Sequence, residues 1–271
     1  MKDMKRIYQT TMSVVVSFCS ATFWHTKTKT YLLYAFLTCQ GLLLFTACQP
    51  NTWQSLFNGR DLSGWHVECR PQDRAKNYWT VEDSTILCNS MGDKKHHYVW
   101  LISDKEYDDF ILTFRFQAYR ESSGNSGVQF RSTFDPDLAG GWLNGPQADI
   151  HPKEPMTWRT GLIYDETYEV QRWLSPARQN WNMSPKYAPS EHVFKFADEG
   201  DGWNEMVLIC RGTHVKTIVN GITRTDWDGI GILDDYEHQR RKSGTKGRIA
   251  FQLHRNDELK IRFKDIMIKK L

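Results

Sequence analysis

Cysteine is scarce in this chain of 271 residues, and its spacing excludes two ways of stabilising a small domain. Six cysteines are present, and only Cys69, Cys88 and Cys210 follow Cys48. An odd number cannot form a fully paired disulfide framework, although one bridge, with Cys69 and Cys88 as the favoured pair, fits an oxidising compartment. No CxxC pair and no Cys/His ligand spacing occurs, which argues against a structural zinc site.

The sequence also lacks an excess of charge of one sign. The formal net charge is +3, but residues 1–47 hold five basic residues and one acidic residue. The remaining chain has 30 basic against 31 acidic side chains, a formal charge of −1. A near-neutral domain lacks the basic surface that attracts nucleic acids. We therefore expect no nucleic-acid partner.

Helical periodicity is missing too, because no amphipathic stretch of ten or more residues follows Cys48. Short runs with alternating apolar and polar residues recur instead, separated by turn signals such as Asn220–Gly221. The last run changes phase at Lys264–Asp265, which predicts a bulge or a bend. The expected fold class is all-β, a two-sheet antiparallel β-sandwich of jelly-roll type. The runs are residues 79–88, 109–119, 126–132, 205–212, 214–221, 248–254 and 259–271.

The first 47 residues differ in composition from the rest. Two lysines precede an apolar run, Tyr31 to Ala47, and Cys48 follows it. A basic flank, a short hydrophobic core and a small residue before the cut are typical of a secretory signal. The ending LFTAC is similar to a lipoprotein lipobox, with Cys48 as the lipidated residue. A plain transmembrane anchor is the alternative, since the run is just under the ~20 residues that a span requires.

The expected organisation is therefore a signal segment, residues 1–47, followed by a single domain, residues 48–271. A lipid on Cys48 would hold this domain at a membrane of the bacterial cell envelope, in the periplasm or at the cell surface.

One segment, Gly145 to Glu166, is richer in functional groups than an ordinary connection between strands. Gln, Asp, His, Arg and Tyr side chains stand there among Gly, Pro and Trp. Aromatic faces cover the C–H side of a sugar ring, and a few fixed polar groups bind its hydroxyls. The segment therefore fits the floor of a sugar-binding site. A long solvated surface loop is the alternative.

Eight blocks, in order through nearly all of residues 53–271, carry a family resemblance. They are SLFNGRDLSGW, YWTVEDSTI, YDDFILTFRF, NSGVQFRS, GPQADI, TGLIYDE, GWNEMVLICRGTHVKTIVNG and RIAFQLHRNDELKIRFKDIMIKKL. In these blocks the chain resembles the bacterial 3-keto-disaccharide hydrolase family, which has a concanavalin/laminin-G-like jelly roll. The chain departs from the family at Ser84, at Pro146 and in TYEVQRWLSP, Thr167 to Pro176. The last departure bears on substrate size or on the leaving group.

The resemblance implies a substrate glycoside that carries a ketone at C3 of the sugar. Such a ketone acidifies the hydrogen on C2, so a general base can form an enediolate and the C1 substituent can leave by elimination. Water can then add to the product, which gives net hydrolysis. No GxGxxG nucleotide fingerprint follows a strand, so a separate sugar 3-oxidoreductase is expected to make the ketone.

Three residues of these blocks are expected to carry the chemistry. Asp149 is the candidate general base, and His254 is the candidate acid or oxyanion donor. Arg131 is expected to hold a keto or hydroxyl oxygen, or to orient Asp149. The alternatives are structural: an Asx turn for Asp149, a strand-end histidine for His254 and a plain ion pair for Arg131.

Other side chains are expected to bind the sugar. They are Asn125, Gln147, Trp158, Tyr164, Glu166 and Gln252. His151 could extend the site, but a solvated loop histidine is the favoured interpretation. No cofactor is firmly implied; a divalent metal is compatible with the carboxylates and histidines present, although no ligand spacing demands one.

Two other functions are possible for a jelly roll of this composition. A retaining glucanase requires carboxylates about 5 Å apart, and the nearest string, EGDGWNE from Glu199 to Glu205, has the wrong spacing. A non-catalytic carbohydrate-binding jelly-roll module remains open. Such a module would use the same aromatic and amide side chains, but it would not need Asp149 or His254 to titrate.

Overall fold

The computed structural model describes residues 52–271, apart from 123, 177–180 and 190–193. The expected signal segment, residues 1–47, and the expected lipidation site Cys48 lie outside the described residues. Within the described part of the chain, no helix is long and apolar enough to cross a membrane.

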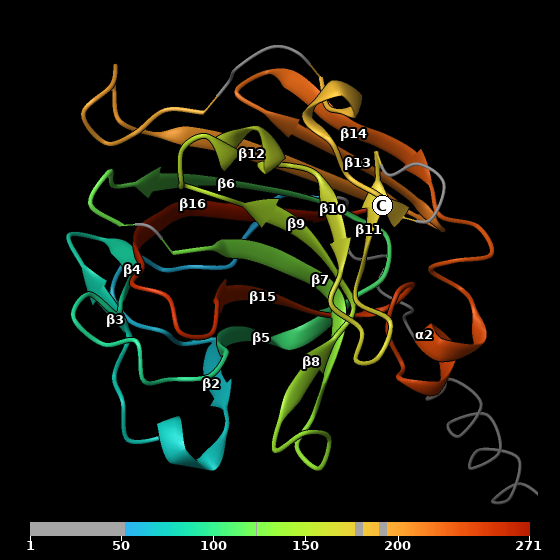
Figure 1. Ribbon diagram of the computed structural model, residues 1–271, viewed down its shortest axis with the longest axis horizontal. Coiled ribbons are helices and arrows are strands. Elements are labelled where there is room, and N and C mark those ends of the chain that lie inside the picture. Colours follow the sequence, from blue (N-terminus) through green and yellow to red (C-terminus); the bar gives the residue numbers. More distant parts are fainter. Residues whose placement is uncertain (1–51, 123, 177–180, 190–193) are drawn as a thin grey trace, which may run out of the picture. The chain divides into compact units, whose positions relative to one another are not determined.

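Two antiparallel sheets of eight strands each pack face to face in the described chain (Figure 1). The first sheet has the order β14 (Ile222–Asp228), β13 (His214–Val219), β12 (Asn204–Arg211), β6 (Phe110–Ala118), β16 (Lys260–Lys270), β4 (Thr85–Asn89) and β3 (Trp79–Glu82), with β1 (Gln54–Ser55) beside β16. The second has the order β11 (Arg172–Ser175), β10 (Ile163–Asp165), β9 (Pro146–Ile150), β7 (Ser126–Asp135), β15 (Gly247–Leu253), β5 (Val99–Tyr107) and β2 (Trp65–Cys69), with β8 (Trp142–Asn144) beside β7.

Helical structure is short in the described residues. It comprises α2 (Tyr236–Arg240) and the 3-10 turns η1 (Pro71–Asp73), η2 (Met156–Arg159) and η4 (Pro185–Tyr187). The prediction of an all-β, two-sheet antiparallel sandwich of concanavalin-like jelly-roll type is confirmed.

The core lies between the sheets and follows from the alternation in the strands. Along β6, Leu112 and Phe114 are buried, while the intervening Thr113 is partly exposed. Phe251 of β15 and Phe263 of β16 stack with ring centroids 4.1 Å apart, so this contact joins the two sheets. Burial of each such side chain contributes roughly 1.5–3 kcal/mol.

Local breaks in regularity fall where the sequence predicts them. The register of β16 shifts between Lys264 and Met267, and Asp265 has φ 53°, which confirms the expected bulge. Asn220 and Gly221 both have positive φ and connect β13 to β14, as a tight two-residue hairpin requires.

The favoured disulfide pair is wrong. Cys69 belongs to β2 and Cys88 to β4, which lie in opposite sheets, and both are buried free thiols. Burial raises the pKa of both thiols, because a thiolate is poorly solvated there.

The Gly145–Glu166 segment runs through β9, η2 and β10, at one end of the second sheet. In β9, Ala148 and Ile150 belong to the core between the sheets. Because side chains alternate along a strand, Gln147 and Asp149 lie on the opposite, outer face. The segment thus presents its polar residues away from the core.

Candidate active site

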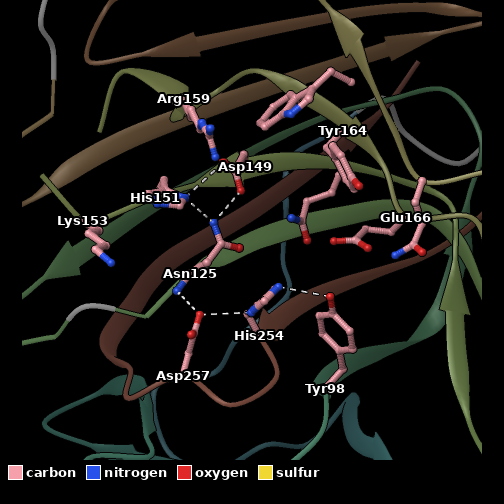
Figure 2. A pocket seen from close by; sticks show the side chains of 13 residues that line it. Tyr98, Asn125, Asp149, His151, Lys153, Arg159, Tyr164, Glu166, His254 and Asp257 are labelled. Carbon is pink, nitrogen blue, oxygen red and sulfur yellow. Dashed lines mark hydrogen bonds and ion pairs between the residues drawn. The ribbon is translucent and has the colours of Figure 1, made fainter. Parts of the chain in front are cut away.

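A cavity of about 430 Å³ opens on the outer face of the second sheet (Figure 2). This volume lies within the ~300–1,000 Å³ typical of small-molecule sites. Its lining residues are Tyr98, Asn125, Gln147, Asp149, His151, Lys153, Arg159, Tyr164, Glu166, Gln171, Trp173, His254 and Asp257. Seven of these belong to Gly145–Glu166, so the segment forms the floor and much of the wall.

Asp149 is a buried carboxylate, 4% exposed, in the middle of this floor. Asn125 Nδ2 donates to Asp149 Oδ1 over 2.9 Å. Burial raises the pKa of Asp149 to about 7, although the Asn125 hydrogen bond and the positive charge of Arg159 partly oppose the rise. A carboxyl group with this pKa can accept a proton near neutral pH and return it later.

His254 directly follows β15 and lies between an acid and a phenol. Its Nδ1 is 3.1 Å from Asp257 Oδ2, and its Nε2 is 3.1 Å from Tyr98 Oη (Figure 2). Burial disfavours a charged imidazole, but the hydrogen bond and charge of Asp257, with the charges of Glu166 and Asp149, outweigh it. The pKa of His254 is therefore raised. A protonated His254 is suited to donate a proton.

Asp257 stays anionic beside this histidine. Burial alone would raise the pKa of Asp257, but hydrogen bonds from His254 and from the backbone N–H of Asn125, at 2.8 Å, stabilise the carboxylate and lower it. The carboxylate in turn fixes the orientation of the imidazole.

Asn125 connects the two halves of the site. Its side-chain amide contacts Asp149 Oδ1 and lies 2.7 Å from His151 Nδ1, while its backbone N–H binds Asp257 (Figure 2). Burial and the nearby Arg159 charge lower the pKa of His151 to about 4. His151 is thus neutral, with Nδ1 accepting from the amide, which leaves the proton on Nε2.

Arg159 supplies a cation with unused hydrogen-bonding capacity. Its guanidinium lies 5.4 Å from the ring centroids of both Trp158 and Trp173. Its Nε is buried and makes no hydrogen bond within the described residues. Because Arg159 lines the cavity, its positive charge is suited to stabilise an oxygen there that becomes negatively charged.

Gln147 offers a second unused polar atom. Its side-chain Oε1 is buried and has no hydrogen-bond partner among the described residues. The side chain lies against Gly127 of β7, where a Cβ would stand 2.3 Å from Gln147 Cδ. Gly127 is therefore the residue that leaves room for Gln147 at the floor.

Most of the predicted site residues meet here. Asn125, Gln147, Asp149, Tyr164, Glu166 and His254 all line the cavity. Gln252 lies behind them, fully buried, and its Nε2 donates to Glu166 Oε1 over 3.1 Å. Gln252 therefore positions Glu166 and is not itself in the lining.

The expectations for Trp158 and His151 need correction. Trp158 is not among the lining residues; its carbonyl accepts from Arg224 and its ring contacts Arg159. Trp173 of β11 supplies the indole in the wall. His151, expected to be a solvated loop histidine, instead lies in the cavity with only 15% of its side chain exposed.

Arg131 does not belong to this cavity, which corrects the expectation that it binds substrate or orients Asp149. Its buried guanidinium donates to the backbone carbonyls of Asp108 and Gly212 and to the Asp109 carboxylate. A bulge explains this placement. Arg131 has φ 50°, and β7 has one extra residue against β15 there, which breaks the alternation that would put Arg131 beside Gln129.

Sequence reasoning missed several lining residues, namely Tyr98, Lys153, Arg159, Gln171, Trp173 and Asp257. Lys153 and Arg159 lie inside the segment Gly145–Glu166, so the charged residues of this segment, taken as a group, indicate the site. Asp257 follows His254 by three residues. Tyr98 precedes β5, and nothing in its local sequence distinguishes it.

No metal ligand set is apparent in the part of the chain that the structure describes. No group of three or more His, Cys, Asp or Glu side chains there is arranged to hold an ion. In the cavity, Asp257 pairs with His254 over 3.1 Å, and Asp149 Oδ2 lies 3.8 Å from His151 Nδ1.

Comparison with known proteins identifies the family. A family described as the 3-keto-alpha-glucoside-1,2-lyase-like domain matches residues 52–269. The chain belongs to this family. Membership supports a carbohydrate-related, hydrolase-like role.

Solved structures share the fold at low identity. Two Parabacteroides distasonis ATCC 8503 proteins, described as candidate glycosyl hydrolases, are 19% and 22% identical with TM-scores of 0.54 and 0.51. The matches cover 82% and 81% of this chain and 95% and 100% of theirs. A Bacillus subtilis protein of unknown function with a galectin-like fold has 15% identity and a TM-score of 0.53, covering 81% of this chain and 94% of its own. No curated protein matches the chain.

Proposed function

We propose that this chain cleaves the glycosidic bond of 3-keto-glycosides by elimination, followed by hydration of the product. The observation that carries the proposal is Asp149, a buried carboxyl group with its pKa raised to about 7, placed in one cavity with Arg159 and His254. A base, a cation and a raised-pKa imidazole are the three groups that this reaction uses.

The proposed steps assign one role to each group. Asp149 takes the proton from C2. The electron pair of the C2–H bond forms the C2–C3 double bond while the π pair of the ketone moves to the C3 oxygen, giving an enediolate that Arg159 stabilises. The enediolate then expels the C1 substituent, and His254 protonates its oxygen as the C1–O bond breaks. Water then adds through its oxygen to C1 and gives a proton back to His254, while Asp149 returns its proton to C2, which completes net hydrolysis.

A non-catalytic carbohydrate-binding module is the competing function. Such a module needs hydrogen-bonding groups for the sugar hydroxyls, but it does not need a group that changes its protonation state near neutral pH. The raised pKa of Asp149 and the Asp257–His254 pair therefore favour an enzyme.

The direct test incubates the purified protein with a 3-keto-glucoside and with the unoxidised glucoside. We expect release of the leaving group from the ketone alone. Deuterium at C2 should slow turnover or exchange with solvent. Binding of both compounds without product would support the binding module, whereas turnover with neither isotope effect nor exchange would refute elimination.

We also propose that Cys48 is lipidated, that the domain lies at the cell envelope, and that a separate sugar 3-oxidoreductase supplies its substrate. The lipobox-like LFTAC sequence supports the first two points. Labelling with a fatty-acid analogue should mark the full-length protein and not a Cys48→Ser variant. Equal labelling, or none in either protein, would refute the anchor.

Arg159→Gln should lower kcat for the 3-keto-glucoside about 10²-fold, because loss of a preorganised oxyanion donor typically has this effect. Arg159→Lys should retain part of the activity, since the charge remains but the planar donor array is lost. Steady-state kinetics of the three proteins would check this. Equal kcat in all three would remove Arg159 from the mechanism.

Asp257→Asn should shift the pH dependence of the reaction. Without the carboxylate, the pKa of His254 should fall, because the hydrogen bond and charge that raise it are gone. The high-pH limb of kcat/KM should therefore move to lower pH. The low-pH limb, set by Asp149 near pH 7, should move less. An unchanged high-pH limb would exclude His254 as the acid.

A further inference from the structure

Both ring nitrogens of His254 are engaged by other groups of the protein. Its Nδ1 lies 3.1 Å from the Asp257 carboxylate and 3.1 Å from the Arg255 carbonyl oxygen, and its Nε2 lies 3.1 Å from Tyr98 Oη (Figure 2). To protonate a leaving group directly, the imidazole would have to lose its contact with the phenol. Tyr98 lines the cavity, so its hydroxyl is the next group along this chain of hydrogen bonds.

The contacts of the imidazole determine where its protons lie. Nδ1 faces two acceptors, Asp257 and the Arg255 carbonyl, so Nδ1 carries a proton in both charge states of His254. In the neutral imidazole, Nε2 therefore accepts a hydrogen bond from the Tyr98 hydroxyl. In the imidazolium, which the raised pKa of His254 favours, Nε2 donates to Tyr98 Oη instead.

Protonation of His254 thus frees the phenol proton for another acceptor. The Tyr98 hydroxyl has no second hydrogen-bond partner among the residues that the structure describes. While Tyr98 Oη accepts from the imidazolium, its own O–H can therefore donate to a molecule in the cavity. Burial raises the pKa of the Tyr98 phenol, so the hydroxyl keeps its proton at neutral pH.

Packing holds the Tyr98 ring in one position. Tyr98 is 4% exposed, and its ring stacks on Trp100 with centroids 5.4 Å apart. It also meets Trp142 and His254 edge to face, with centroid distances of 5.1 Å and 4.9 Å. A donor that is already positioned loses little conformational freedom when the substrate binds.

We propose that Tyr98 is the catalytic residue that delivers the proton to the leaving oxygen, and that His254 supplies this proton to Tyr98. The inference rests on the proposed elimination. As the C1–O bond breaks, the Tyr98 O–H proton moves to the departing oxygen and the Nε2 proton moves to Tyr98 Oη, which leaves the imidazole neutral. When water adds to C1, it gives a proton to Tyr98, and the Tyr98 proton returns to Nε2. Asp257 is a positioning residue.

Two 3-keto-glucosides test this role, one with a methyl and one with a para-nitrophenyl leaving group. Methoxide is a strong base and leaves only with a proton, whereas para-nitrophenolate leaves without one. Tyr98→Phe keeps the packed ring. It should lower kcat/KM for the methyl glycoside about 10²-fold, within the range of a general acid, and leave the para-nitrophenyl glycoside nearly unchanged.

Tyr107→Phe is the matched control. Tyr107 lies at the other end of β5, is 3% exposed and does not line the cavity. This variant should cleave both glycosides as the wild type does. If Tyr98→Phe slows both glycosides equally, or neither, Tyr98 does not deliver the proton, although elimination stands. If the wild type cleaves neither glycoside, the proposed reaction itself is wrong.

A double variant tests whether His254 and Tyr98 act on one path. Adding His254→Gln to Tyr98→Phe should slow cleavage of the methyl glycoside no more than the slower single variant does, because either change interrupts the same proton transfer. Losses that multiply would show that the two residues act independently, which would overturn the relay.

A nitrogen NMR spectrum of the protein with isotope-labelled histidine tests the hydrogen-bonded chain without turnover. We expect neutral His254 to carry its proton on Nδ1, and we expect its Nε2 resonance to shift in Tyr98→Phe. A proton on Nε2 of the neutral ring, or an Nε2 resonance that does not respond to Tyr98→Phe, would overturn the relay even if both glycosides are cleaved.

Discussion

Replacing Asp149 with Asn is expected to lower kcat for a 3-keto-glucoside by about 10²- to 10⁴-fold, the range that a positioned general base contributes. The amide can still accept the hydrogen bond from Asn125, so the cavity should keep its shape. It cannot accept the C2 proton. Steady-state kinetics and C2 exchange with solvent would check this. Substantial activity in the variant would remove Asp149 from the mechanism.

The same substitution should stabilise the folded protein above pH 7. The folded-state pKa of Asp149 is raised from 3.8 to about 7. Between these values the folded protein holds a proton that the unfolded chain has lost, so the free energy of unfolding falls as pH rises. About three pKa units correspond to at most about 4 kcal/mol. Asparagine does not titrate, so the Asp149→Asn variant does not lose this stability as pH rises.

Denaturant unfolding from pH 4 to pH 8 would measure the effect. The stability gap between Asp149→Asn and the wild type should widen in favour of the variant as pH rises towards 7, then level off. Asp257→Asn is the control of opposite sign, because the pKa of Asp257 is lowered in the fold. Its carboxylate stabilises the protein at neutral pH, so that variant should be less stable there. If the difference in unfolding free energy between Asp149→Asn and the wild type does not change with pH, the raised pKa of Asp149 in the folded protein is wrong.

Much of the fold was predictable because strand alternation is a local property. The phase change at Lys264–Asp265 shows the bulge directly in the sequence, and Asn220–Gly221 specifies its own turn. Asp149 and Gln147 were likewise predictable as site residues, since both stand in a polar segment at alternate positions on one strand face.

The remainder depends on contacts between distant segments. Tyr98 reaches His254 across 156 residues of sequence, and Asn125 joins Asp149 to Asp257 from a third segment. Local sequence carries no signal for such pairings, which follow from the order of β5, β15, β7 and β9 in the sheet. Trp173 lies in the site because β11 pairs with β10, which local sequence likewise does not reveal.

A single bulge in β7 explains why the sequence-based placement of Arg131 is wrong. Alternation from Val128 and Phe130, both in the core, predicts that Arg131 faces outward with Gln129. The extra residue at the bulge breaks this alternation. The Arg131 side chain therefore points towards Asp108, Asp109 and Gly212, to which it donates hydrogen bonds. Nothing in the string NSGVQFRS reveals the bulge, because the residue opposite it lies in β15.

Arg131→Met is therefore expected to destabilise the protein by about 3 kcal/mol while leaving kcat of the folded fraction unchanged. The substitution leaves two backbone carbonyls and the Asp109 carboxylate without their donor, and breaking a buried pair typically costs about 3–5 kcal/mol. We expect the lower end, since Asp109 retains access to water at 39% exposure. Urea unfolding and kinetics well below the unfolding temperature would measure the two quantities separately.

Arg115→Met is the matched control, because the side chains of the Arg115–Asp201 pair are 31% and 55% exposed and the pair should contribute less than about 1 kcal/mol. Arg131→Lys should recover little of the lost stability, since one ammonium group cannot reach the three acceptors that the guanidinium spans. An Arg131→Met protein of normal stability but with kcat reduced at least tenfold would restore Arg131 to the catalytic machinery. A large loss of stability with unchanged kcat would show that Arg131 is structural and connects the β7 bulge to the turns at Asp109 and Gly212.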